Sequence, residues 1–109
     1  MANAMSKIGF IGAGRVGTAL ALGLAQAGYS VAAVASHTYA SAQALATIVV
    51  GAQGLAPLHC KAEREPSEVV AHCDIVFLTV PDDAIEAVAG ALTWRKGQAV
   101  VHCRGALSA

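Results

Sequence analysis

Three glycines near the start of the chain constrain its fold more than any other feature. They stand in the segment KIGFIGAGRVG, where Gly12, Gly14 and Gly17 form a G-x-G-x-x-G pattern. Lys7–Ile11, before the pattern, is short and apolar, which predicts a buried strand. Residues 15–27, after it, are rich in alanine and leucine, which predicts a helix. The pattern therefore marks a place where a buried strand turns directly into a helix.

The rest of the chain continues this alternation of apolar strands and helices. Strands are predicted at Ser30–Ala35, 74–80 and 98–103. Residues 51–65 have the least regular pattern, and a short edge strand is predicted within them at 58–60. Helices are predicted at 38–50, 66–73 and 82–92, and Gly28 is expected to end the first helix in a left-handed conformation. Continuous apolar strands separated by helices indicate a parallel sheet covered on both faces. The right-handed crossover rule then favours an α/β fold of the doubly wound Rossmann type, with a mainly parallel sheet and three layers.

Composition excludes several other classes of protein. The 109 residues suit one compact domain, and 56% of them are hydrophobic while only 13% are charged. Net charge is zero and Arg95-Lys96 is the longest basic run, so no nucleic-acid partner is expected. Arg15, inside the apolar stretch 8–25, argues against a secretory signal or a membrane span. Residues 1–6 are expected to be a leader or an expression remnant.

The three cysteines are an odd number without C-x-x-C spacing, which is typical of reduced thiols in a cytoplasmic protein. Each follows a histidine, but neighbouring residues of a strand point to opposite faces, so such pairs do not ligate one metal. No metal site is therefore predicted, and the same geometry argues against a catalytic role for Cys103 assisted by His102.

Two other features are expected to be structural. Residues 63–65, Glu-Arg-Glu, are expected to form a solvated loop, and Trp94 is expected to cover an edge of the sheet.

The predicted fold gives the glycines a chemical role. Where a parallel strand ends and a helix begins, the free N–H groups and the helix dipole attract a phosphate. Gly12 allows the tight turn, Gly14 leaves room for a pyrophosphate at the backbone, and Gly17 lets the helix pack closely. Together with the intervening Ala13, Arg15 and Val16, they form a predicted dinucleotide site. Helix–sheet packing alone remains the alternative.

The end of the second strand bears on which dinucleotide binds. NAD sites usually place an acid there to bind the ribose 2′-hydroxyl, but this chain has no Asp or Glu between Lys7 and Glu63. Ser36, His37 and Thr38 follow the strand instead and can donate hydrogen bonds to a 2′-phosphate. Arg15 can supply the positive charge, so NADP is favoured over NAD. The alternative for residues 36–38 is a polar loop that caps the next helix.

Two further segments follow predicted strands at the same sheet edge. Val80, Pro81 and Asp82 end the central strand, where they would line the groove beside the cofactor riboses. His102 ends the last strand, toward the nicotinamide. Simple strand termination is the alternative for both segments, and no catalytic residue is identified.

These motifs give the chain a family resemblance. IGFIGAGRVGTAL, FLTVPDDAI and VVHCRGALS, within residues 7–109, resemble the N-terminal NADP-binding domain of proteins related to pyrroline-5-carboxylate reductase and to deazaflavin-dependent NADP reductases. The match is best in a branch where an all-helical domain of unknown function follows. The resemblance implies NADP binding by residues 12–17 and 36–38. Relatives often carry Arg where His37 stands, and a small polar residue where Arg104 stands; a cation there could hold a substrate carboxylate or occlude the site.

The resemblance also carries expectations about the whole protein. Residues 7–109 would be an NAD(P)-binding domain truncated before a helical domain that supplies the substrate pocket and a homodimer interface. The parent would then be an NADP-dependent oxidoreductase that transfers hydride to a small imine, carbonyl or deazaflavin, whereas this chain alone would bind nucleotide without catalysis. The alternatives are a non-catalytic nucleotide-binding or sensor module and a fragment that is inactive alone.

Overall fold

The computed structural model describes residues 6–52, 60–80 and 82–102 of the chain. Strands and helices alternate in the predicted order. They are β1 (Lys7–Ile11), α1 (Arg15–Gln26), β2 (Ser30–Ala35), α2 (Tyr39–Ala52), β3 (Lys61–Glu63), α3 (Pro66–His72), β4 (Ile75–Leu78), α4 (Asp82–Ala91) and β5 (Ala99–His102). Gly28 has a φ of +96°, so it ends α1 in the left-handed region as predicted. None of the described helices is long and apolar enough to cross a membrane.

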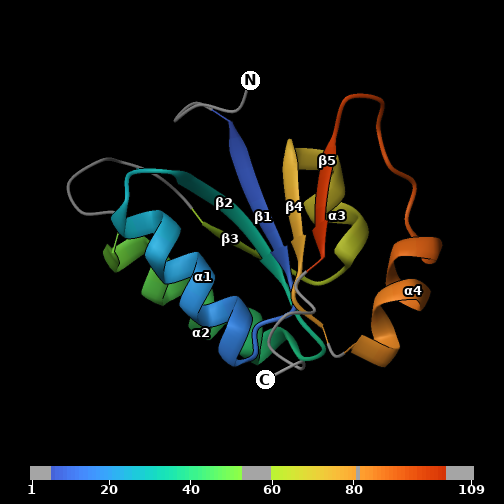
Figure 1. Ribbon diagram of the computed structural model, residues 1–109. Coiled ribbons are helices and arrows are strands. Elements are labelled where there is room, and N and C mark those ends of the chain that lie inside the picture. The colour runs from blue at the N-terminus through green and yellow to red at the C-terminus, as the bar shows by residue number, and fades with distance from the viewer. Residues whose placement is uncertain (1–5, 53–59, 81, 103–109) are drawn as a thin grey trace.

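The strands form one parallel sheet in the order β3-β2-β1-β4-β5 (Figure 1). The chain moves outward from β1 through β2 to β3, and then crosses back to place β4 on the other side of β1. The connections therefore diverge at the carboxyl ends of β1 and β4, which is the position where open α/β sheets bind ligands. This topology confirms the predicted Rossmann-type fold.

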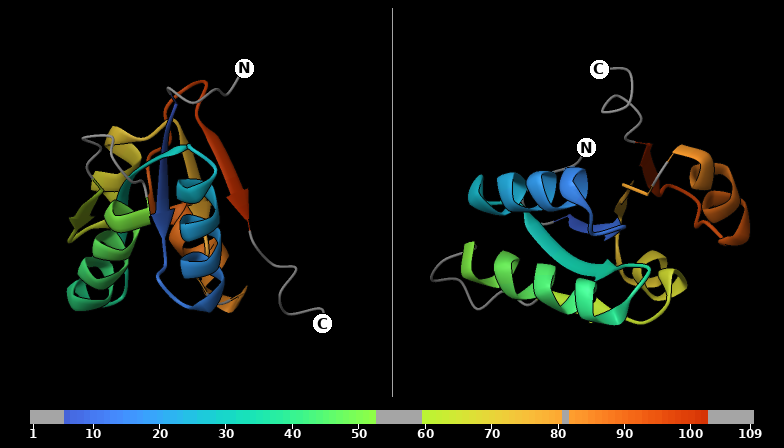
Figure 2. Two further views of the ribbon diagram at one scale, coloured as in Figure 1. Left: turned by 90° about the vertical axis from the view of Figure 1, so that its left-hand side faces the viewer. Right: turned by 90° about the horizontal axis from the view of Figure 1, so that it is seen from below.

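Helices lie on both faces of the sheet (Figure 2), and a hydrophobic core lies between the sheet and each helical layer. Helices α1 and α2 cover one face, where Phe10 stacks on Phe77 with 5.0 Å between ring centroids. Helices α3 and α4 pack on the other face around Val76 and Leu78, both fully buried. Trp94 packs against this second core and donates its Nε1–H to the carbonyl of Ala89 in α4 at 3.0 Å. The three layers give a rigid platform beneath the loops at the carboxyl edge.

The edge strand differs from its predicted position. β3 begins at Lys61, after the predicted 58–60, because its register is set by pairing with β2: Lys61 lies opposite Ala33 and Glu63 opposite Ala35. Cys60 precedes the strand, and residues 58 and 59 lie outside the described residues. The expectation that Glu63 is solvated was wrong. Its side chain is only 3% exposed, with Lys61 Nζ 3.9 Å from Oε1.

Candidate functional site

The turn from β1 to α1 requires glycine at its first position. Gly12 has a φ of +112°, and its N–H donates to the Ala35 carbonyl at 2.8 Å. A Cβ on Gly12 would lie 2.5 Å from the Thr79 carbonyl oxygen. The Thr79 hydroxyl, in turn, donates to the Gly12 carbonyl at 2.8 Å. The turn is thus clamped between the ends of β2 and β4, and only a residue without a side chain fits there.

Gly17, in the first turn of α1, is also required by packing. A Cβ there would lie 2.5 Å from the Gly12 carbonyl oxygen and 2.6 Å from the Thr79 Oγ1. The close packing that the sequence predicts is therefore present, although the contact is with the turn and Thr79 rather than with the body of β1. Its effect is to hold the start of α1 directly over the strand ends.

Gly14 differs from both of these glycines. It is exposed, its φ of −78° suits any residue, and a Cβ there would meet no atom within 4 Å. Gly14 is the N-cap of α1, yet no side chain caps the helix and the first turn contains no acidic residue. Among the described residues, no side chain therefore offsets the positive end of the helix dipole. Neither backbone conformation nor packing explains the glycine at this position.

A cavity of about 560 Å³ opens beside this turn. Its walls come from the carboxyl ends of β1, β2, β3 and β4 and from one side of α4. The apolar part is formed by Ile11, Pro66, Val80, Ala84 and Val88, and the remaining lining residues are Gly12, Ser36, His37, Arg64 and Glu65. Polar groups thus gather at the ends of β2 and β3, while apolar groups face them from β1, β4 and α4.

The structure brings some of the predicted site residues together and separates others. Gly12, Ser36, His37 and Val80 line the cavity. The remaining residues of the glycine turn lie at its side, with Ala13 and Val16 half-buried and Arg15 exposed. His102 is exposed at the end of β5, and it does not line the cavity. Pro81 and the Asp82 side chain lie outside the described residues.

Thr38 caps the helix that follows it, which is the alternative given above for residues 36–38. Its Oγ1 accepts a hydrogen bond from the Ser41 N–H at 3.2 Å and donates to the Ser41 Oγ at 2.8 Å. Both contacts lie at the start of α2, so the hydroxyl caps that helix. Thr38 therefore contributes by fixing the loop that carries Ser36 and His37.

Sequence reasoning missed Arg64 and Glu65, which both line the cavity. Arg64 is not in a free loop: its guanidinium carbon lies 3.9 Å from the centroid of the Tyr39 ring. Glu65 precedes α3, where its N–H donates to the Glu68 Oε1 at 3.1 Å. The missing signal was the register of β3, because aligning Glu63 with Ala35 places the two following residues beside Ser36 and His37.

The described cysteines are structural. Burial raises the pKa of the Cys73 thiol to about 12, and burial likewise raises the pKa of the Cys60 thiol to about 12. Both remain protonated at neutral pH and are poor nucleophiles. Among the residues that the structure describes, no three His, Cys, Asp or Glu side chains gather in a way that could hold a metal ion.

A comparison with protein families shows to which family the chain belongs. Residues 7–104 match the family described as NADP oxidoreductase, coenzyme F420-dependent. The chain belongs to this family. The match confirms the relation to NADP oxidoreductases that the motifs indicate, and it covers every element of the sheet from β1 to β5. No curated protein matches the chain.

Solved structures show the same fold for this family domain. A candidate NADP oxidoreductase from Bacteroides fragilis, BF3122, is 25% identical with a TM-score of 0.75, over 92% of this chain and 36% of that one. A reductive aminase from Aspergillus terreus, in complex with NADPH and ethyl-5-oxohexanoate, is 21% identical with a TM-score of 0.65, over 89% and 31%. A variant imine reductase from Myxococcus stipitatus, in complex with NAD⁺, is 23% identical with a TM-score of 0.64, over 90% and 30%. The chain spans about a third of the length of these proteins.

Proposed function

We propose that the chain is the NADP(H)-binding domain of an oxidoreductase that transfers hydride to a small imine, carbonyl or deazaflavin substrate. The observation that carries the proposal is Gly14. The fold itself explains Gly12 and Gly17, but a Cβ at Gly14 would meet no atom of the described residues within 4 Å. A glycine is needed there if a ligand occupies the space that its Cβ would take.

The charge of the surroundings suits a pyrophosphate in that space. The start of α1 presents its positive dipole end without a capping side chain, and Arg15 adds a full charge in the first helical turn. The backbone N–H groups at the start of α1 would then hold the negative charge of the diphosphate. Residues 13–17 accordingly bind the diphosphate in this proposal.

The cavity suits the adenosine half of the cofactor. Its apolar walls, including Val80 and Val88, offer surfaces for the flat adenine ring, and Ser36 and His37 offer donors at the end of β2. With the diphosphate at α1, the other half of the cofactor would extend past β4 toward β5, with His102 at that end. The absence of an acid between Lys7 and Glu63 favours NADP over NAD.

The catalytic part of the proposal concerns the whole protein. When bound, the nicotinamide supplies the hydride. The described residues of this chain would fix the diphosphate and the adenosine, so that the nicotinamide is held at the sheet edge. Hydride transfer also needs a substrate held against the nicotinamide with water excluded. We place that pocket, and a homodimer contact, in a helical domain that follows this one in the full-length protein.

A titration of the folded chain with NADPH and NADH, followed by calorimetry, tests the proposal. We expect saturable binding with tighter NADPH, and we expect Gly14→Val to abolish binding of both cofactors while the domain stays folded. Gly23→Val is the matched control, because Gly23 is also exposed on α1 and a Cβ there meets nothing within 4 Å. Full affinity in Gly14→Val, or no binding by a folded wild-type chain, would contradict the proposal.

Activity of the full-length protein separates an enzyme from a sensor. NADPH oxidation in the presence of small imines, carbonyls or a deazaflavin supports the oxidoreductase. Cofactor binding without oxidation of NADPH by any of these substrate classes would favour a non-catalytic nucleotide-binding module.

A further inference from the structure

We infer that Arg64, stacked on Tyr39, is the residue by which this site distinguishes a ribose 2′-phosphate from a 2′-hydroxyl. The inference rests on the proposed dinucleotide function and names the specificity determinant of that same site. It also assigns the selective charge to the end of β3, whereas the sequence alone pointed to the end of β2 and the start of α1.

The sheet places Arg64 beside the end of β2. Glu63 pairs with Ala35 in the parallel β2–β3 register, so the next residue of each strand continues side by side. Arg64 and Ser36 are those next residues, and both line the cavity together with His37. In Rossmann-type sites the end of the second strand is where the adenosine ribose is bound. Arg64 therefore reaches the 2′ position from the neighbouring strand.

The stacking on Tyr39 fixes the guanidinium before any ligand arrives. The guanidinium carbon lies 3.9 Å from the ring centroid, well within the range of a cation–π contact. A flexible arginine loses rotamer freedom when it binds, and an arginine already held against a ring loses less. The guanidinium carries five N–H donors, which can bind the oxygens of a phosphate. Tyr39 is thus a positioning residue for Arg64.

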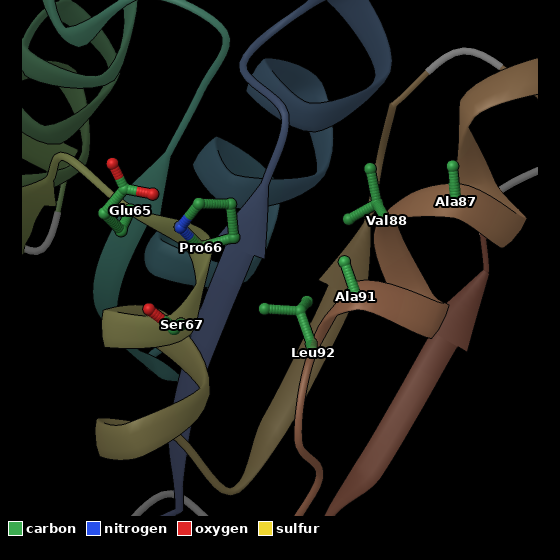
Figure 3. Close-up of a pocket in the computed structure, with 7 residues that line it drawn as sticks. All are labelled: Glu65, Pro66, Ser67, Ala87, Val88, Ala91 and Leu92. Carbon is green, nitrogen blue, oxygen red and sulfur yellow. The ribbon is translucent and has the colours of Figure 1, made fainter.

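A second observation concerns the carboxylate in the same cavity. Glu65 could accept hydrogen bonds from ribose hydroxyls, which would favour NAD, so its position relative to Arg64 matters. Glu65, Pro66 and Val88 also line a second cavity of about 350 Å³ between α3 and α4 (Figure 3). These shared residues mark the end of the first cavity that faces α4. Of these two cavities Ser36, His37 and Arg64 line the first and not the second, whereas Glu65 lines both, so a substitution of Glu65 is needed to decide whether its carboxylate meets the ribose.

Affinities for four ligands test the inference: NADPH, NADH, and the fragments 2′,5′-ADP and 5′-ADP. Arg64→Ala should weaken NADPH and 2′,5′-ADP by about 10- to 100-fold, the usual loss for a hydrogen-bonded charge. NADH and 5′-ADP should change by less than about twofold, because they lack the phosphate that the arginine contacts. The ratio of NADPH to NADH affinity is therefore the decisive measurement.

Three further variants separate this role from a general effect. Lys96→Ala removes the same charge from an exposed turn before β5, at the opposite edge of the sheet, and should leave all four affinities unchanged. Tyr39→Leu should lower the affinity for NADPH selectively, whereas Tyr39→Phe retains the ring and should restore it. Glu65→Gln should leave NADH binding unchanged if the carboxylate does not hold the ribose.

The outcomes distinguish this inference from the proposed function. Equal losses of NADPH and NADH in Arg64→Ala, or an unchanged NADPH affinity, would overturn the role of Arg64 and leave the dinucleotide function standing. A marked loss of NADH in Glu65→Gln would instead assign the ribose to the carboxylate and overturn the inference. If the folded wild-type chain binds none of the four ligands, the proposed function fails and the inference fails with it.

Discussion

Two regions of the candidate site are built in contrasting ways. The glycine turn, residues 12–17, is one continuous segment whose shape depends on the absence of side chains. The selection cluster, which we define as Ser36, His37, Tyr39 and Arg64, is assembled from side chains on the segments after β2 and β3. The first region would determine whether a dinucleotide binds, and the second which dinucleotide. Substitutions of the glycines in the turn should therefore affect both cofactors, and those in the selection cluster should change their ratio.

The largest effect is expected from Gly12→Ala. Its Cβ would lie 2.5 Å from the Thr79 carbonyl oxygen, and its φ of +112° is strained for any L side chain. We expect the free energy of unfolding to fall by about 3 kcal/mol, from overpacking and backbone strain together. Urea denaturation followed by circular dichroism measures this change. A stability equal to wild type would show that the turn can relax, and that the fold does not need this glycine.

Gly14→Ala should separate binding from stability within the same turn. The residue is exposed and its φ of −78° is allowed for alanine, so the unfolding free energy should change by less than about 1 kcal/mol. Affinity for NADPH and for NADH should fall by comparable factors, because the methyl group takes the space of the shared diphosphate. Calorimetry and urea denaturation on one sample give both quantities. A loss of stability comparable with that of Gly12→Ala would assign Gly14 to folding instead.

The same contrast explains what the sequence could and could not predict. Each strand and helix depends on local patterns, and the glycine turn lies within six consecutive residues, so its structural roles at Gly12 and Gly17 could be predicted. Arg64 could not be placed in this way. Its position depends on the register of β3 against β2, which is a contact between segments about thirty residues apart, and a Glu-Arg-Glu run in isolation has the composition of a solvated loop.

Thr38 and Glu63 show a related limit of sequence reasoning. A hydroxyl after a strand can bind a ligand or cap the next helix, and only the position of Ser41 decides that Thr38 caps α2. A glutamate in a charged run is usually solvated, but here Glu63 is the last residue of β3, paired with Ala35, and it is buried. In both cases the identity of the residue allows two environments, and tertiary packing selects one.

Arg15→Ala and His37→Ala test whether these two side chains contact the 2′-phosphate or the diphosphate. Arg15 is exposed at the start of α1, and His37 lines the cavity beside Arg64. We expect each substitution to weaken NADPH by about 3- to 10-fold and NADH by less, since solvent screens an exposed charge. Fluorescence titration with both cofactors measures the ratio. Equal losses for the two cofactors would place these side chains at the diphosphate rather than at the 2′-phosphate.

The smallest effect, and one of opposite sign, is expected from Gly23→Ala. Gly23 lies in the second half of α1, exposed, where a Cβ would meet no atom within 4 Å. It resembles Gly14 in having no packing role, but it is remote from the N–H groups at the start of α1 to which we assign the diphosphate. Alanine should raise the free energy of unfolding by about 0.5 to 1 kcal/mol through its greater helix propensity, with both cofactor affinities unchanged. Urea denaturation measures the free energy of unfolding, and calorimetry measures the two cofactor affinities.

A loss of cofactor affinity in Gly23→Ala like that in Gly14→Ala would contradict this expectation. The effect of the Gly14 side chain would then have to arise from the helix as a whole, and open space at the N-cap would no longer be evidence for a bound diphosphate.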